Sequence, residues 1–395
     1  MSASLLIGPD RTGKRVAIAD GVIAESAPEG TPVLACADGV ISSGAVCAHT
    51  HIYSALAPYG MPAASPPPED FLQILERVWW QLDRAIDADT LRAGARDYVA
   101  KALLAGTTTL VDHHESPNLI EGSLKILAEV CEEIGVRALL CFGATERNFG
   151  RDEARRGLAE CRTIKPSPLV RGLVGLHASF TVSDETIREA GDLARDLGTA
   201  LHVHVAEDFS DVADAQKRGF VGPLERLIDL GAVVPNSIFA HGVHLSPDQV
   251  RRAKELGAWF VQNPRSNEGN RVGYAKSLSA SPKVALGVDG WDPDMSIEKT
   301  ALSRLAAANG DAVDADARLA AGHAMVAAHF GLAETPMAPG AAGDVVLRRN
   351  GAVSDVIVAG RHVVKDGRLV TGDAAVIGDD ARRAAARLWE RMATL

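Results

Sequence analysis

The stretch GAVCAHTH, residues 44–51, is a short apolar run that ends in two histidines one residue apart. Side chains at positions i and i+2 of a strand point to the same face, so we expect His49 and His51 to lie side by side. Imidazole nitrogens are good ligands for an ion such as Zn²⁺. Twelve histidines in 395 residues would give about 0.4 such pairs by chance, so the pair is meaningful only if the rest of the chain supplies further ligands.

Seven more apolar runs follow, with helical patterns between most of them. They are TTTLVDHH (107–114), VRALLCFGATE (136–146), RGLVGLH (171–177), TALHVHVAE (199–207), SIFAHG (237–242), AWFVQNP (258–264) and KVALGVD (283–289). One helix start is especially clear, because Ser246 can cap it, Pro247 takes its first position and Gln249 completes a capping box. Strands and helices that alternate eight times predict an α/β fold, a (β/α)₈ TIM barrel over residues 44–335.

Both ends of the chain differ from this middle part, since they alternate apolar and polar residues around two-residue turns. The turns are Asp20-Gly21 near the start, and Asn350-Gly351 and Asp366-Gly367 near the end. Such turns between alternating runs indicate β-hairpins. We therefore predict a small β-sandwich domain formed jointly by residues 1–43 and 336–395, including a final amphipathic helix over about 379–394.

The composition limits the possible partners and location. The net charge of −10 argues against nucleic acid or an anionic membrane surface as a partner. No run reaches the roughly 18 apolar residues of a membrane span, and the start of the sequence does not resemble a signal peptide. Five scattered cysteines without a C-x-x-C pair favour reduced thiols and a cytoplasmic location.

Nearly every predicted strand ends in an ionisable or amide side chain. These are His51, His113, Glu146, His177, His204, His241, Asn263 and Asp289. In a barrel the C-terminal ends of the strands meet at one rim, where active sites are built. Residues far apart in the sequence are therefore expected to surround a single opening.

Four of the residues near this rim are candidate metal ligands: His49, His51, His204 and Asp289. Three neutral imidazoles and one carboxylate suit zinc or iron(II) and leave a position for water. Such an ion lowers the pKa of the water towards neutrality. His202 points the same way as His204 on the same strand, and spacing alone does not choose between them.

Two further residues are candidates for proton transfer. Glu207 follows His204 by three residues, where a carboxylate can reach a water on the metal or the substrate. His241 ends the sixth predicted strand and is either a further ligand or a base that orients the water. We expect Trp79 and Trp80, on a predicted helix, to divide between the core and the mouth of the barrel.

The motifs HTH, HVAE, AHGVHLS and GVDG, in this order and on these strands, resemble the amidohydrolase superfamily. More closely, the chain is similar to its cytosine-deaminase or ATZ/TRZ-type aminohydrolases. The segments AHTHIYSAL, PPEDFLQILERVWWQLDRAI, GTTTLVDHHESPN and QNPRSNEGNRVG resemble the SsnA-type aminohydrolases within that group. The resemblance covers essentially the whole chain.

The resemblance implies a role for each matching residue. His49, His51, His204 and Asp289 would hold one divalent ion, with zinc preferred over iron(II) or manganese. Glu207 would protonate a ring nitrogen of the substrate, and His241 would polarise the water or the tetrahedral intermediate. Asp289 would also pass a proton from the water to the leaving ammonia. The third and fourth strands carry no lysine to bridge two ions, which favours a site for one.

Other residues near the rim are candidate substrate contacts: His113, His114, Glu146, His177 and Asn267. For His177 the alternative is a histidine that only forms hydrogen bonds within the protein. The loop after the first strand, ALAPYGMP, lacks the arginine that many relatives carry, so substrate anchoring by this loop is in doubt.

The sequence thus predicts a metal-dependent hydrolase of C–N bonds that deaminates a small amino-substituted N-heterocycle of purine, pterin, pyrimidine or triazine type. The alternatives are hydrolysis of a cyclic amide or of a C–Cl bond, and, in another class, a barrel that binds without catalysis. The resemblance further implies a homodimer or a larger homo-oligomer.

Overall fold

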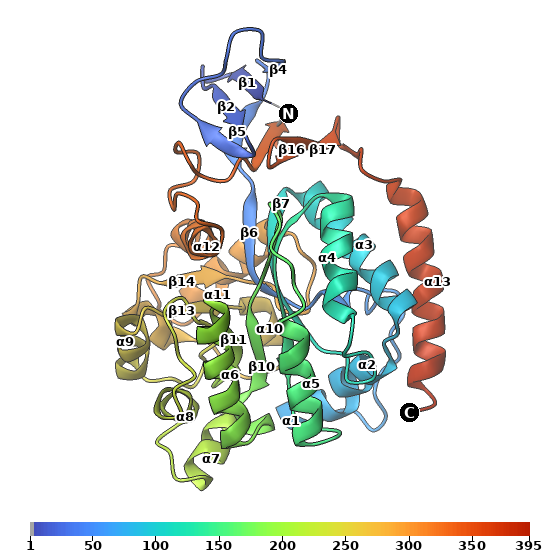
Figure 1. The fold of residues 1–395 in the computed structure, drawn as a ribbon, viewed down its shortest axis with the longest axis vertical. Coiled ribbons are helices and arrows are strands. Elements are labelled where there is room, and N and C mark those ends of the chain that lie inside the picture. Colours follow the sequence, from blue (N-terminus) through green and yellow to red (C-terminus); the bar gives the residue numbers. More distant parts are fainter. Residues whose placement is uncertain (1–3) are drawn as a thin grey trace.

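The computed structural model describes residues 4–395 and contains a parallel β-barrel with a smaller β unit at one end (Figure 1). Neighbouring strands in the barrel follow the chain order, which confirms the predicted (β/α)₈ fold. The eight strands are β6 (Ala45–Thr50), β7 (Thr107–His114), β8 (Arg137–Ala144), β10 (Val174–Ala178), β11 (Leu201–Val205), β12 (Ile238–His241), β13 (Trp259–Gln262) and β14 (Val284–Leu286). A short strand, β9 (Val170–Gly172), also pairs with β8.

The barrel closes where the chain just past β14 meets the end of β6. The backbone N–H groups of Val288 and Asp289 each donate to the His49 carbonyl at 3.0 Å, and the His51 N–H donates to the Asp289 carbonyl at 3.1 Å. A Cβ at Gly287 would lie 2.8 Å from the backbone nitrogen of His49, so only glycine allows this approach. The closing hydrogen bonds therefore fix the backbone of three candidate ligands.

Helices surround the barrel, and the chain between most pairs of strands passes through at least one of them. They are α3 (Ala88–Ala105), α4 (Ser123–Ile134), α5 (Arg151–Cys161), α6 (Asp184–Leu197), α7 (Phe209–Lys217), α8 (Pro223–Asp229), α9 (Pro247–Glu255), α10 (Pro264–Gly269), α11 (Met295–Ala308) and α12 (Ala315–Phe330). The predicted capping box at α9 is present, since Ser246 and Gln249 exchange two hydrogen bonds. No helix within residues 4–395 combines the length and apolar character needed to cross a membrane.

The chain after β6 forms a helical segment that covers part of the C-terminal end of the barrel. It consists of α1 (Phe71–Ile74), η2 (Leu75–Trp79) and α2 (Trp80–Ala85), where η2 is a π-helical turn. Short helices η1 (Ile52–Ser54), η3 (Ser179–Thr181) and η4 (Lys276–Ala280) lie in other loops. A π-helical turn inserted in an α-helix often marks a functional site.

The small β unit is a sandwich of two sheets at the N-terminal end of β6. One sheet has the order β3 (Val22–Ala24), β2 (Val16–Ala19), β1 (Leu5–Asp10), β4 (Val33–Cys36), and the other has β18 (Arg368–Leu369), β17 (Arg361–Lys365), β16 (Ala352–Val358), β15 (Val345–Arg349), β5 (Val40–Ser43). Asp20, Asn350 and Asp366 adopt positive φ in the three predicted hairpin turns. The unit lies at the opposite end of the barrel from His49 and His51.

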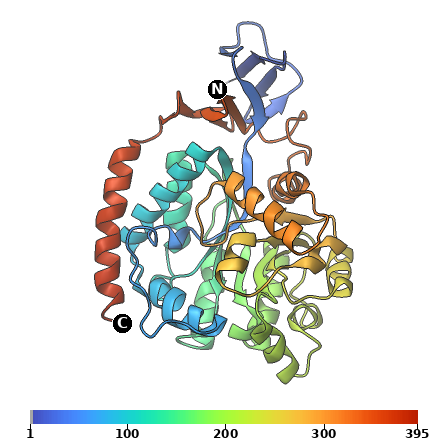
Figure 2. The ribbon, with the colours of Figure 1, turned by 180° about the vertical axis from the view of Figure 1, so that it is seen from behind.

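The last helix, α13 (Ala374–Met392), begins earlier than expected, because Asp373 caps it. It runs along the outside of the barrel and packs on α3 and α2 (Figures 1 and 2). Its buried residues Ile377 and Leu388 belong to the same apolar core as the barrel strands. The predicted division at residues 43 and 336 stays a prediction, but α13, which it assigned to the small β unit, covers the barrel.

Candidate metal centre

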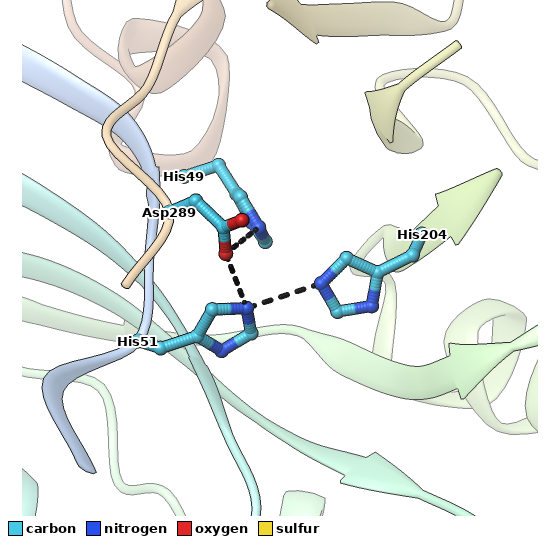
Figure 3. Close-up of side chains that lie close together, drawn as sticks. All are labelled: His49, His51, His204 and Asp289. Carbon is cyan, nitrogen blue, oxygen red and sulfur yellow. Dashed lines mark hydrogen bonds and ion pairs between the residues drawn. The ribbon is translucent and has the colours of Figure 1, made fainter. Parts of the chain in front are cut away.

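The structure brings His49, His51, His204 and Asp289 together at the C-terminal end of the barrel (Figure 3). Asp289 Oδ1 lies 2.8 Å from His51 Nε2 and 3.5 Å from His49 Nε2, and the Nε2 atoms of His51 and His204 are 3.1 Å apart. All four side chains are buried. Residues from β6, β11 and the turn after β14 thus point at one position.

Hydrogen bonds on the far side of the rings fix the orientation of these histidines. His51 Nδ1 donates to the carbonyl of His113 and His204 Nδ1 donates to the carbonyl of His177, both at 2.6 Å. In the neutral form of each ring the proton sits on Nδ1, and the two Nε2 atoms then present lone pairs to one another. Burial acts to lower the pKa of His51, but Glu115 and Asp289 raise it well above its usual value, so the site favours a cation, either a proton or a metal ion, at His51 Nε2. The donor set therefore fits a metal ion.

Burial and neighbouring charges set the protonation of His49, His204 and Asp289. Burial lowers the pKa of His49 to about 3 and that of His204 well below its usual range, so both imidazoles are neutral and able to bind metal. Burial also acts to raise the pKa of Asp289, but the neighbouring His51 and His49 hold it well below its ordinary value. His49 Nε2 is buried and has no hydrogen-bond partner among residues 4–395. A neutral imidazole and an ionised carboxylate are the forms that coordinate a divalent ion.

His202 lies one layer deeper in the barrel than His204. Its Nε2 is 2.9 Å from His49 Nδ1, and its own Nδ1 is 3.7 Å from Cys141 Sγ. The two strand residues that spacing left open as ligands thus have different surroundings. His204 faces the ligand cluster, and His202 holds the ring of His49.

Glu207 and His241 lie beside this cluster. His241 Nε2 is 3.5 Å from Glu207 Oε2 and 3.9 Å from Asp289 Oδ2, and it has no hydrogen-bond partner within the described chain. His241 Nδ1 donates to Asn267 Oδ1 at 2.8 Å, which leaves Nε2 free to accept. Burial raises the pKa of Glu207 to about 7. Glu207 can therefore carry a proton at neutral pH.

Three residues of this region adopt positive φ although they are not glycine: Ala206, His241 and Asp289. Each follows or ends a barrel strand, and the left-handed conformation turns the next part of the chain across the rim. Such conformations cost free energy and persist at functional sites because the surrounding structure enforces them.

A cavity of about 770 Å³, which includes space open to solvent, lies above the cluster. This volume suits a small molecule. Six aromatic side chains line it: Tyr53, Phe71, Trp79, Trp80, Phe180 and Trp291. Both tryptophans of the pair at 79 and 80 line the cavity, and Trp79 also packs against the apolar core, where we expected one of the pair.

Of the predicted substrate contacts, only His177 lines the cavity. His113 lies behind the ligands and bonds to Glu115 and the carbonyl of Leu176. His114 bonds to Ser116, while Glu146 accepts from Ser183 at the start of α6. Asn267 holds His241. His113, His114, Glu146 and Asn267 thus lie outside the lining of this cavity.

The sequence did not point to several residues of the cavity. Glu115 lines it, 3.3 Å from His51 Nδ1, and follows directly after the two histidines that end β7. Asn270 donates to Glu207 Oε1 at 3.1 Å. Asp83 lies on α2, where it reads like an ordinary polar position of an amphipathic helix. Of these residues, only Glu115 had a usable sequence signal, because it directly follows the histidines that end a strand.

Comparison with known proteins gives a consistent picture. The model of the amidohydrolase family matches residues 40–363. A 5-methylthioadenosine/S-adenosylhomocysteine deaminase of Caldanaerobacter subterraneus is 28% identical over 64% of this chain and 58% of that protein, so the match leaves much of that relative uncovered. An 8-oxoguanine deaminase of Pseudomonas aeruginosa is 28% identical over 72% of this chain and 68% of its own.

A solved structure agrees with these relatives in fold. An adenosine deaminase from Xanthomonas campestris with bound zinc superposes with a TM-score of 0.83, at 23% identity and over 98% of both chains. The family model covers all eight barrel strands, including every candidate ligand, and most of the part of the small β unit that follows them. This chain belongs to the amidohydrolase family.

Proposed function

We propose that this protein is a metal-dependent hydrolytic deaminase, which replaces an amino group on a small N-heterocycle by oxygen and releases ammonia. The observation that carries the proposal is the convergence of His49, His51, His204 and Asp289 next to Glu207, at the base of an aromatic cavity. The relatives named for deamination of adenosine derivatives and of 8-oxoguanine support the purine type within this class.

The four ligands would hold one divalent ion, with zinc preferred over iron(II) or manganese. A bound ion of this kind polarises a water molecule and lowers its pKa, which makes hydroxide available at neutral pH. A single ion is supported by the cavity lining, because no lysine of the described chain lines it to bridge a second.

The protein's own side chains move the protons of the reaction. Protonated Glu207 gives its proton to the ring nitrogen beside the carbon under attack, which makes that carbon more electrophilic. Asp289, whose Oδ2 accepts from Ser266, takes a proton from the attacking water and gives it to the departing amino group. The remaining hydroxyl proton returns to Glu207 as the carbonyl forms. Water is consumed and one ammonia leaves.

His241 and the aromatic walls position the reactants. His241 Nε2 can accept a hydrogen bond from the attacking water, since Asn267 holds the proton on Nδ1. Trp79, Trp80 and Trp291 offer flat apolar faces against which a heterocycle can stack. The cavity also removes the reacting groups from bulk water, which strengthens these interactions.

Ammonia release from a panel of amino-substituted purines, pterins, pyrimidines and triazines tests the proposal. We expect the zinc-loaded protein to release ammonia from at least one class, and the Glu207→Gln variant with equal zinc to release about 10²–10⁴-fold less. Chloride release or ring opening instead of ammonia would assign the alternative hydrolytic activities. No ammonia release from any member of the panel, with zinc bound, would contradict deamination.

We also expect the enzyme to act in the cytoplasm as a homodimer or larger homo-oligomer. Light scattering on the purified protein tests the assembly, and a monomeric mass at micromolar concentration would contradict it.

A further inference from the structure

One wall of the cavity carries a buried carboxylate that the reaction above does not use. Asp83, on α2, lines the cavity and is 1% exposed. Its Oδ2 accepts from Arg147 Nη2 at 2.8 Å. Its Oδ1 is buried and has no hydrogen-bond partner within residues 4–395. Leaving a buried acceptor unpaired is unfavourable, and no group of the described chain satisfies this oxygen.

Arg147 is held by other groups and does not line the cavity. Its guanidinium lies over the Trp80 ring, 4.6 Å from the centroid, and its Nε donates to Thr145 Oγ1 at 3.2 Å. The cation thus fixes one oxygen of Asp83 from behind. The π-helical turn Leu75–Trp79 immediately precedes α2, so it sets the rotation at which Trp80 and Asp83 leave the helix.

The rest of the cavity lining is rich in carboxyl groups. Six line it, and no lysine or arginine of the described chain does; the six are Asp83, Glu115, Glu207, Asp208, Asp211 and Asp289. Glu115 Oε2 and Asp211 Oδ1 are also buried without a hydrogen-bond partner. In all three carboxyl groups the other oxygen has a partner: Glu115 bonds to His113, Asp211 accepts the backbone N–H of Ala206, and Asp83 accepts from Arg147. Asp83 is the one of the three whose partner is an arginine.

We propose that Asp83 Oδ1 binds an N–H or O–H donor of the substrate, and that the cavity selects neutral or cationic heterocycles and rejects those with a carboxylate or phosphate. A donor satisfies the unpaired oxygen, whereas an anionic group away from the ligand cluster would be buried beside carboxyl groups, with no lysine or arginine in the cavity lining to pair with it. This inference rests on the proposed function only in taking the cavity as the substrate site.

Binding to a catalytically impaired protein tests the inference without turnover. The probes are two matched sets: adenosine, 5′-amino-5′-deoxyadenosine and adenosine 5′-monophosphate, and 6-hydroxymethylpterin with pterin-6-carboxylate. Calorimetric titration would use the zinc-loaded Glu207→Gln variant, alone and combined with Asp83→Asn. We expect the neutral and cationic members of at least one set to bind at least tenfold more tightly than the anionic member. Asp83→Asn, which turns an amide N–H towards the same place, should reduce this preference at least tenfold.

A matched control separates this effect from damage to the fold. Asp344→Asn also removes a buried carboxylate paired with an arginine, Arg137, but lies in the connection that leads into the small β unit, outside the cavity lining. Combined with Glu207→Gln, Asp344→Asn should leave unchanged the ratio of affinities between the neutral or cationic probes and the anionic probe. If Asp83→Asn does not fold, the affinities of the neutral, cationic and anionic probes for the Glu207→Gln variant still show whether the cavity rejects anionic heterocycles.

The outcomes distinguish this inference from the proposed function. Equal or tighter binding of the anionic probes, or no binding of any probe at millimolar concentration, would overturn the selectivity. The same ratio in the Asp83→Asn variant would overturn the role of Asp83. Selective binding without ammonia release by the wild type would overturn deamination and leave the binding inference standing.

Discussion

His202 and His204 lie two residues apart on β11 and differ in their depth within the barrel, and they make different contacts. His204 Nε2 faces His51 Nε2, while His202 Nε2 contacts His49 Nδ1. Strand alternation predicts that both point inward, but it does not say how far along the strand the metal lies. That depth is set by the stagger between β6 and β11, which are not neighbours in the barrel.

Replacing these two histidines should therefore affect zinc binding to different degrees. His204→Gln removes a ligand, and we expect less than about 0.1 equivalents of zinc to remain after dialysis. His202→Gln removes only the group that orients His49, so we expect zinc affinity to fall about 10–100-fold. Competition with a fluorescent chelator measures both. A His202→Gln variant that binds zinc like the wild type would show that His202 merely fills space.

Asn267 offers a test of how His241 is positioned. In Asn267→Leu the Nδ1 proton of His241 loses its acceptor, and we expect kcat to fall about 10²-fold at unchanged zinc content. Asn267→Asp keeps an acceptor at the same place and should recover most of this loss. Full activity in the leucine variant would contradict the role, as would equal losses in both variants.

The junction of β14 with β6 is the element on which the site depends. Adding a Cβ at Gly287 would bring it within 2.6 Å of Asn263 Oδ1 and 2.8 Å of the His49 nitrogen. We expect Gly287→Ala to lower the free energy of unfolding by about 1–3 kcal/mol and to weaken zinc binding. Gly378→Ala is the control, since its Cβ in α13 would meet only an arginine side chain at 3.9 Å. It should be neutral or stabilise by up to about 1 kcal/mol. Chemical denaturation measures both, and equal changes in the free energy of unfolding for Gly287→Ala and Gly378→Ala would contradict this account.

The barrel strands could be predicted because each is a short buried run with a polar residue at its end. The meeting of the four candidate ligands at one place could be predicted because strand ends converge. The wall that carries Trp79, Trp80 and Asp83 could not. Its shape depends on a π-helical turn and on contacts with Arg147, which no local pattern specifies. The position of α13 was missed for the same reason, since its apolar face fits either a sheet or another helix.

The whole molecule should lose stability in mild acid, in part through His329 near the end of α12. Burial lowers the pKa of this imidazole to about 4, and its Nε2 has no hydrogen-bond partner within the described chain. The unfolded chain, with an ordinary pKa of about 6.5, binds the proton first, so stability is full above that value and falls as the pH drops towards about 4. We expect the difference in free energy of unfolding between His329→Gln and the wild type to be about 1–2 kcal/mol more favourable to the variant at pH 5 than at pH 7.5. Urea denaturation at the two pH values measures the difference, and a pH-independent difference would contradict it.

Titration of the metal-free protein with zinc, while ammonia release is followed, tests the central claim most directly. The substrate is the most active member of the panel. The account predicts that activity rises linearly and stops rising at one zinc per chain, and that Glu207→Gln binds the same single zinc but releases almost no ammonia. Ammonia release without metal, a rise that continues to two zinc ions per chain, or full activity in Glu207→Gln would contradict it.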